Sequence, residues 1–184
     1  MIHLILGGAR SGKSRFALNQ VIALSTAKHL PVTFVATATA IDPEMQSRIT
    51  HHQAERPKDW GLAEIPLDLE GFLTDLHNAA PQILLIDCLT LWLNNQLFAD
   101  PTQDFKKLFT DLVTALKASS ADIFLVSNEV GLGVIPMGEI SRQFVDQAGW
   151  LNQLLAQHAD NVTFVAAGLP MTLKDTSDIK STSR

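Results

Sequence analysis

The sequence Gly-Gly-Ala-Arg-Ser-Gly-Lys-Ser at residues 7–14 constrains this chain more than any other stretch. It matches G-x-x-x-x-G-K-S, the pattern of a phosphate-binding P-loop. Such a loop needs a strand before it and a helix after it. Residues 2–6 form a short apolar run, and apolar residues recur close to helical spacing over residues 15–28. The motif therefore predicts a nucleotide-binding α/β domain.

Each part of this loop has an expected task. The backbone N–H groups turn toward phosphate oxygens, and the following helix adds the positive end of its dipole. The residues expected to cradle the phosphates are Gly7, Gly8, Ala9, Arg10, Ser11 and Gly12. We expect Lys13 to reach the terminal phosphates and Ser14 to ligate Mg²⁺.

Length, charge and cysteine content limit the classes of protein to which this chain can belong. A chain of 184 residues suits one domain with a real core. The net charge of −5 and the lack of a long basic run argue against nucleic acid as the main partner. The single cysteine, Cys88, excludes an internal disulfide and fits a reducing compartment. Without a leader pattern or an apolar run of about 20 residues, we expect a cytoplasmic protein with no membrane span.

Apolar runs of strand length alternate with helical patterns along the chain. Strands are predicted at residues 2–6, 32–36, 62–65, 83–87, 123–127 and 162–167, and helices at 15–28, 41–56, 67–79, 89–98, 105–118 and 139–158. Because parallel strands need such crossovers, the predicted fold class is an α/β P-loop nucleotide-binding fold, a mostly parallel sheet with helices on both faces. Residues 1–174 are expected to form a single domain, and residues 175–184 a disordered tail. Gly149, inside the last helix, suggests close packing against another element.

Polar residues follow several predicted strands. They are Thr37 to Thr39, Asp87, and Asn128 with Glu129. Ligands of open α/β sheets bind at these carboxyl ends, so we expect the polar groups to converge at one edge with the P-loop. Asp87 ends an apolar strand in the Walker B manner, where it can hold Mg²⁺ or accept a proton from a substrate hydroxyl. Cys88 is expected to be buried beside this strand rather than catalytic.

The helix predicted at residues 41–56 carries Glu44, Arg48 and His52 on one face. A pair of neighbouring histidines, His51 and His52, suggests metal binding, but adjacent helical residues point about 100° apart and would not readily chelate one ion. Taken alone, this helix has the pattern of a solvated face of mixed charge.

Taken together, the motifs resemble the bifunctional adenosylcobinamide kinase/adenosylcobinamide-phosphate guanylyltransferase family of cobalamin biosynthesis, over nearly all of residues 2–174. The resemblance rests on the P-loop, Glu44-Met45, Arg48-Ile49, His51-His52, Arg56-Pro57 with Trp60, Asn128-Glu129-Val130-Gly131, and the series Arg142, Phe144, Asp146, Gly149, Asn152 and Gln153. The histidine pair followed by Arg-Pro-x-x-Trp is far more specific than the P-loop.

The resemblance implies two reactions. The hydroxyl of the aminopropanol arm of adenosylcobinamide takes a phosphoryl group from ATP or GTP, with Mg²⁺. GMP then passes from GTP through a guanylylated histidine, at His52, to adenosylcobinamide phosphate. Lys13 and Asp87 complete the implied catalytic set, and Ser14 and Asp87 the metal set. Further implied nucleotide contacts are Thr37, Ala38, Thr39, Gln53, Ala54, Glu55, Arg56, Glu64 and Asp87. The family also implies a homotrimer with the corrinoid site between subunits.

Two other functions fit the P-loop. One is a kinase of another small alcohol that never guanylylates itself, in which His52 would have no task. The other is an ATPase or GTPase module. The guanine-reading N-K-x-D sequence of switch GTPases is missing, which weakens the GTPase version.

Overall fold

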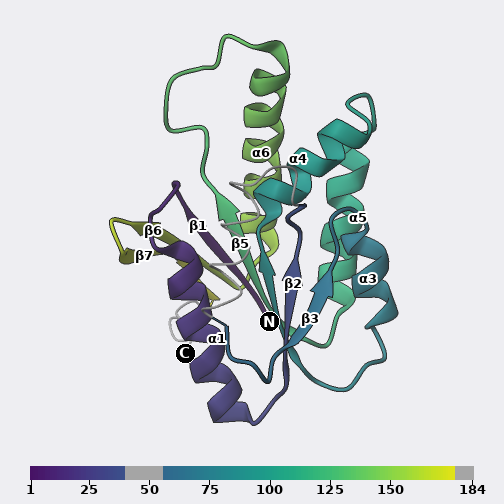
Figure 1. Cartoon of the computed structure of the whole chain (residues 1–184), viewed down its shortest axis with the longest axis vertical. Helices are drawn as coiled ribbons and strands as arrows, with labels where there is room; N and C mark the ends of the chain where they lie inside the picture. The colour runs from purple at the N-terminus through teal and green to yellow at the C-terminus, as the bar shows by residue number, and fades with distance from the viewer. Residues whose placement is uncertain (40–55, 177–184) are drawn as a thin grey trace, which may run out of the picture.

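A seven-stranded sheet runs through the molecule in the order β3-β2-β4-β5-β1-β6-β7 (Figure 1). The computed structural model describes residues 1–39 and 56–176. The strands are β1 (Ile2–Gly7), β2 (Val32–Ala36), β3 (Gly61–Glu64), β4 (Ile83–Asp87), β5 (Asp122–Asn128), β6 (Asn161–Ala166) and β7 (Leu169–Asp175). The helices are α1 (Lys13–Lys28), α3 (Leu69–Asp75), α4 (Leu89–Ala99), α5 (Phe105–Ala118) and α6 (Glu139–His158). Of the helix predicted at 41–56, only Arg56 lies within the described residues.

The sheet is parallel except at one edge. β1 pairs in parallel with β5 and β6, β4 with β2 and β5, and β2 with β3, whereas β6 and β7 form an antiparallel hairpin. The predicted class, a mostly parallel sheet with helices on its faces, is confirmed. Because the strands are parallel, their carboxyl ends meet at one edge, where polar residues follow β1, β2, β4 and β5.

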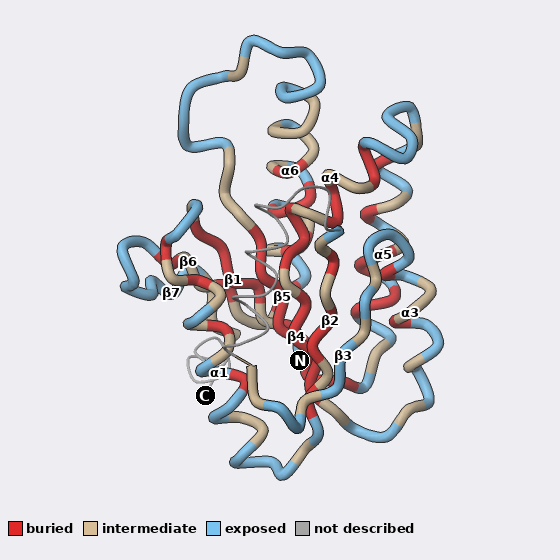
Figure 2. The backbone as a smooth tube through the Cα atoms, in the orientation of Figure 1, coloured by how far each residue is buried: buried red, intermediate tan, exposed pale blue. Residues whose placement is uncertain are grey.

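Alternate residues of the central strands enter two different cores. In β1, Leu4 packs under α3, α4, α5 and α6, while Ile5 packs under α1 on the opposite face. In β4, Ile86 and Leu85 divide in the same way. The centre of the sheet is consequently buried (Figure 2). Burial on both faces explains why these strands read as continuous apolar runs.

Helix α3 is shorter than predicted. It begins after Asp68, whose carboxylate accepts a hydrogen bond from the Gly71 N–H at 2.8 Å. It ends at Asp75, because the chain then tightens into turns, with the His77 N–H bonded to the Thr74 carbonyl oxygen at 3.1 Å. No helix in the described part of the chain has the length and apolar character needed to cross a membrane.

Strand β7 was not predicted. It places Lys174 and Asp175, at the start of the polar C-terminal segment, in an edge strand rather than a loose tail. The Lys174 ammonium donates to the carbonyl oxygens of Ala156 and Gln157 near the end of α6, at 3.0 and 2.9 Å. The remainder of the predicted tail, residues 177–184, lies outside the described residues.

Within the described residues, Gly149 does not have the role expected for it. Apart from its chain neighbours and the backbone of its own helix, a side-chain methyl placed on this glycine would meet no described atom within 4 Å. Close packing against another element in the described part of the chain therefore does not explain a glycine inside α6.

Candidate active site

The loop after β1 has the tight turn that a P-loop needs. Gly12 precedes the first residue of α1 with φ 92°, a left-handed conformation that glycine adopts without strain. At Gly7, a Cβ would lie 2.5 Å from both the Ser11 Oγ and the Val165 carbonyl oxygen, so no side chain fits. The loop also contacts the β6–β7 turn, where the Gly168 N–H donates to the Ser11 carbonyl oxygen at 2.8 Å.

Lys13, the first residue of α1, lies folded against this loop. Its Nζ donates to the Gly8 carbonyl oxygen at 3.1 Å, and only 8% of the residue is exposed. Burial lowers the pKa of its ammonium, and the negative charge of Asp87 at the end of β4 offsets part of that shift. Lys13 and Asp87, the expected Walker B carboxylate, therefore lie within electrostatic range of each other, with Ser14 half-buried next to Lys13.

Thr37 follows β2 and is fully buried beside Cys88. Its hydroxyl donates to the Cys88 carbonyl oxygen at 2.8 Å and accepts from the Cys88 N–H at 3.0 Å. The Asn95 side chain donates to the Thr37 carbonyl oxygen at 2.8 Å. Thr37 therefore joins the carboxyl ends of β2 and β4, whereas Ala38 is half-buried and Thr39 exposed.

Cys88 is buried, as predicted. Desolvation, together with the negative charge of Asp87, raises the pKa of its thiol to about 12. A thiol with this pKa is protonated at neutral pH and is a poor nucleophile.

Arg56 lies over the Phe34 ring of β2, with its guanidinium carbon 4.2 Å from the ring centroid. Burial lowers the pKa of this guanidinium, and the charge of Glu64, the last residue of β3, acts in the opposite direction. Stacking on the ring restricts the orientation of the guanidinium plane. Arg56 and Glu64, both predicted to contact nucleotide, thus lie near each other at the β2–β3 side of the sheet.

Asn128 ends β5 directly beside the P-loop. It is the register partner of Gly7, and the Glu129 N–H donates to the Gly7 carbonyl oxygen at 3.1 Å. The Asn128 N–H donates to the Thr90 hydroxyl at 2.7 Å. Asn152 of α6 donates its Nδ2 to the Asn128 carbonyl oxygen at 3.3 Å.

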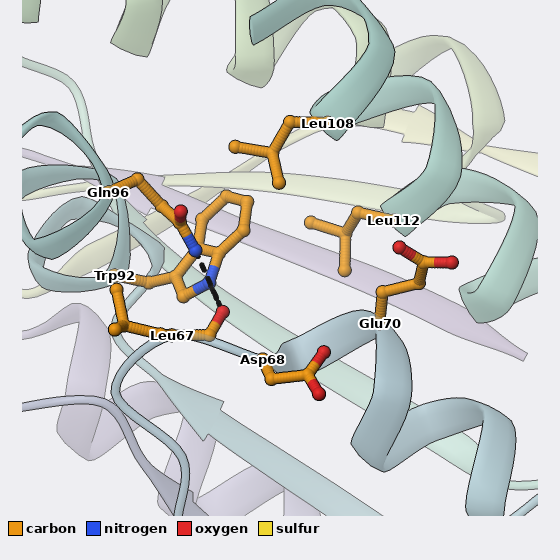
Figure 3. Close-up of a pocket in the computed structure, with 7 residues that line it drawn as sticks. All are labelled: Leu67, Asp68, Glu70, Trp92, Gln96, Leu108 and Leu112. Atoms are coloured by element: carbon orange, nitrogen blue, oxygen red, sulfur yellow. Dashed lines mark hydrogen bonds between the residues drawn. The ribbon is translucent and has the colours of Figure 1, made fainter. Parts of the chain in front are cut away.

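A separate pocket of about 250 Å³ lies among α3, α4 and α5 (Figure 3). Its lining residues are Leu67, Asp68, Glu70, Trp92, Gln96, Leu108 and Leu112. The side chains of Trp92 and Gln96 both donate to the Leu67 carbonyl oxygen, at 2.7 and 2.8 Å. None of the described residues predicted to bind nucleotide lines this pocket.

Comparison with known families agrees with the P-loop geometry. The sequence model of the family described as cobinamide kinase / cobinamide phosphate guanyltransferase matches residues 3–173. The chain belongs to this family. Membership in the cobinamide kinase / cobinamide phosphate guanyltransferase family confirms the resemblance drawn from the P-loop and the histidine motif.

Individual relatives are similar over nearly their whole length. A Pseudomonas aeruginosa protein named bifunctional adenosylcobalamin biosynthesis protein CobP is 49% identical over 174 residues, covering 95% of this chain and 98% of that protein. A Salmonella typhimurium protein named bifunctional adenosylcobalamin biosynthesis protein CobU is 38% identical, covering 95% and 100%. A solved ATPase domain superposes with a TM-score of 0.53 at 14% identity, covering 89% of this chain and 68% of that one. That likeness shows the fold alone.

Several predicted site residues of this cobinamide kinase family member lie outside the described residues. They are His52, Gln53, Ala54 and Glu55, so their roles stay predictions. The described members fall into three groups. Lys13, Asp87 and the P-loop form one, Thr37 to Thr39 at the end of β2 form the second, and Arg56 with Glu64 forms the third.

Four residues that organise this site have no role predicted from sequence. Thr90, Asn95 and Asn152 each hold the backbone at a strand end, and Gly168 holds the P-loop. In the sequence, Asn95 stands out only as part of an asparagine pair and Asn152 only as part of a motif series. No spacing rule connects a side chain with a distant backbone group, so no sequence pattern would have revealed these bonds.

Proposed function

We propose that this chain catalyses both reactions that its family's description names, on cobinamide and then on cobinamide phosphate, and that its substrates are the adenosyl forms, adenosylcobinamide and adenosylcobinamide phosphate. The observation that carries the proposal is the buried P-loop lysine, Lys13, within electrostatic range of Asp87, the expected Walker B carboxylate, in a chain that matches the family over residues 3–173. ATP or GTP supplies the phosphoryl group, and GTP supplies the guanylyl group.

In the first reaction, the hydroxyl oxygen of the aminopropanol arm attacks the γ-phosphorus of the nucleotide. The bond from this phosphorus to the β–γ bridging oxygen breaks, and the nucleoside diphosphate leaves. Lys13 stabilises the negative charge on the phosphates, while the loop N–H groups fix their position. Asp87 has two candidate tasks, as acceptor of the hydroxyl proton and as ligand of Mg²⁺.

Mg²⁺ is the proposed metal of this site. The Ser14 hydroxyl and the Asp87 carboxylate are hard oxygen ligands of the type that Mg²⁺ prefers. They belong to the segments that follow β1 and end β4, at the carboxyl edge of the sheet. Bound there, the ion would neutralise phosphate charge.

In the second reaction, a neutral imidazole nitrogen of His52 attacks the α-phosphorus of GTP, and pyrophosphate leaves. A phosphate oxygen of adenosylcobinamide phosphate then attacks the same phosphorus, giving adenosylcobinamide-GDP and free His52. Neutral imidazole is a competent nucleophile at neutral pH. The guanidinium of Arg56 is proposed to offset charge that develops on the phosphorus.

The protein is further proposed to act in the cytoplasm as a homotrimer. Support for assembly comes from the loop between β5 and α6, which projects from the molecule (Figure 1) and exposes large apolar side chains. Val134 and Met137 are 96% and 97% exposed. Size-exclusion chromatography with light scattering tests the proposal, and a monomeric mass at micromolar concentration would contradict it.

Intact-protein mass after incubation with GTP and Mg²⁺ tests the guanylyl transfer. We expect a gain of one GMP in the wild type and none in His52→Ala, with the adduct lost in acid and kept in base. The matched control is His51→Ala, which should still gain GMP. Absence of the adduct where GTP binds would leave a P-loop kinase as the better account.

A further inference from the structure

Among the described residues, four buried polar side-chain atoms have no hydrogen-bond partner. Three of them lie near Gly7 and Asn128, which are register partners in the neighbouring strands β1 and β5. They are the Ser11 Oγ, the Asn128 Oδ1 and the Asn152 Oδ1. An unpaired buried polar group costs about 1–3 kcal/mol, so such groups in a native fold need an explanation. The Ser11 hydroxyl can donate to a phosphate oxygen, whereas the two amide oxygens can only accept.

Asn128 has a central place in this arrangement. Its strand, β5, lies between the P-loop strand β1 and the strand β4 that carries Asp87 (Figure 2). Gly7 is its register partner, and Asp87 is paired with Val126, two residues earlier in β5. Asn128 therefore lies at the carboxyl edge between the phosphate loop and the acidic residue.

The backbone of Asn128 is held on both sides. Its N–H donates to Thr90 at 2.7 Å, and its carbonyl oxygen accepts from Asn152 at 3.3 Å. Asn152 is itself 5% exposed. These bonds set the point from which the Asn128 side chain projects, a requirement for a group that must meet a reacting atom.

We infer that Asn128 is a further catalytic residue of the phosphoryl-transfer reaction, donating its side-chain amide to the terminal phosphate of the nucleotide on the P-loop, and that Asn152 is its positioning residue. This inference rests on the proposed kinase function. The Oδ1 is the enclosed end of the Asn128 amide, which leaves the N–H₂ at the open end of a half-buried residue. Phosphate oxygens only accept hydrogen bonds, and the amide nitrogen has two N–H donors.

The two reactions should depend on this contact to different extents. In phosphoryl transfer the terminal phosphate is the group that moves, and its oxygens are where the transition state must be stabilised. In guanylyl transfer the bond broken is at the α-phosphorus, so the terminal phosphate is only held. Loss of the amide donor should therefore lower kcat of the kinase reaction far more than the rate of self-guanylylation.

The test compares Asn128→Ala, Asn128→Asp and Asn152→Ala with wild type and with Asn19→Ala, an exposed asparagine of α1. Four properties are measured: kinase kcat and KM for ATP, the rate of GMP attachment from GTP, the ratio of ATP to ADP affinity, and the melting temperature. For Asn128→Ala we expect kcat to fall about 10²-fold and GMP attachment to stay within about threefold of wild type. The ATP preference over ADP should fall about three- to tenfold. Kinase kcat should be lower for Asn128→Asp than for Asn128→Ala. The kcat of Asn152→Ala should lie between those of wild type and Asn128→Ala.

Other outcomes of these measurements would contradict the role inferred for Asn128. If both reactions and the melting temperature fall together, the role of Asn128 is structural and the inference is wrong. If KM alone rises, the contact is not catalytic. If the wild type neither phosphorylates adenosylcobinamide nor takes up GMP, the proposed function fails, and the ATP to ADP affinity ratio still reports whether Asn128 contacts the terminal phosphate.

Discussion

The Nζ of Lys13 lies 3.1 Å from the carbonyl oxygen of Gly8, so the ammonium group proposed to bind phosphate is bonded to its own loop. This bond uses one of the three ammonium donors and orders a long side chain. Because burial lowers the pKa of Lys13, a bound phosphate would stabilise the charged form that burial disfavours.

Replacement of Lys13 by methionine should abolish most of the kinase activity. Methionine keeps an unbranched side chain and removes the charge that stabilises the transferring phosphoryl group. We expect kinase kcat to fall by about 10²- to 10³-fold. Steady-state kinetics checks this, with Lys106→Met on the exposed side of α5 as the control. A Lys13→Met enzyme with near wild-type kcat would contradict the assigned role.

Gly7→Ala should destabilise the fold, whereas Gly8→Ala should not. The new methyl at Gly7 would lie 2.5 Å from a backbone oxygen, that of Val165, while one at Gly8 would meet nothing within 4 Å. We expect a loss of about 1–3 kcal/mol in unfolding free energy for Gly7→Ala. Urea denaturation of both variants measures the difference, and equal midpoints would refute the close approach.

Thr37→Val should destabilise the protein even without nucleotide. Valine has nearly the same shape but leaves the Cys88 N–H without its partner. The expected cost is about 1–3 kcal/mol of unfolding free energy. Thr37→Ser keeps the hydroxyl and serves as the matched variant. If Thr37→Val were as stable as Thr37→Ser, the hydroxyl would be free to serve a ligand instead.

Protonation of His3 should destabilise the fold. Burial lowers the pKa of its imidazole from 6.5, and the N-terminal ammonium and Lys28 add to this, while Asp122 and Asp160 oppose it. The unfolded chain therefore binds more protons over the window below pH 6.5, so this part of the stability is present above 6.5 and is lost as pH falls through the folded pKa.

Unfolding free energies of wild type, His3→Gln and His158→Gln between pH 7.5 and 5 measure this contribution. The wild type should lose stability relative to His3→Gln on acidification, because glutamine does not titrate. His158, exposed at the end of α6, is the control. Parallel curves for wild type and His3→Gln would remove His3 as a source of acid sensitivity.

Sequence patterns predicted the buried strands well and the edge strand β3 to within one residue, but not the other edge strand, β7. β2 and β4 have the predicted bounds because burial on both faces makes each a mostly apolar run. β7 escaped prediction because it is an exposed edge strand with a proline as its second residue. It forms through pairing with β6 rather than through a pattern of its own.

For the candidate site, sequence patterns likewise identified the local motifs but not the hydrogen bonds between distant segments. The P-loop and Asp87 are local motifs, and the parallel sheet brings them together as expected. The bonds of Thr90 and Asn152 to Asn128 join segments far apart in the chain, and only the folded structure reveals them.

The place of β1 between β5 and β6 has a consequence for synthesis on the ribosome. Among the described strands β1 is made before its two neighbours, β5 at residues 122–128 and β6 at residues 161–166. At about 5–20 residues per second, roughly 10 to 30 seconds pass before both sides of this apolar strand can be paired. Nucleotide can therefore help to fold the P-loop only after β5 and β6 have been made.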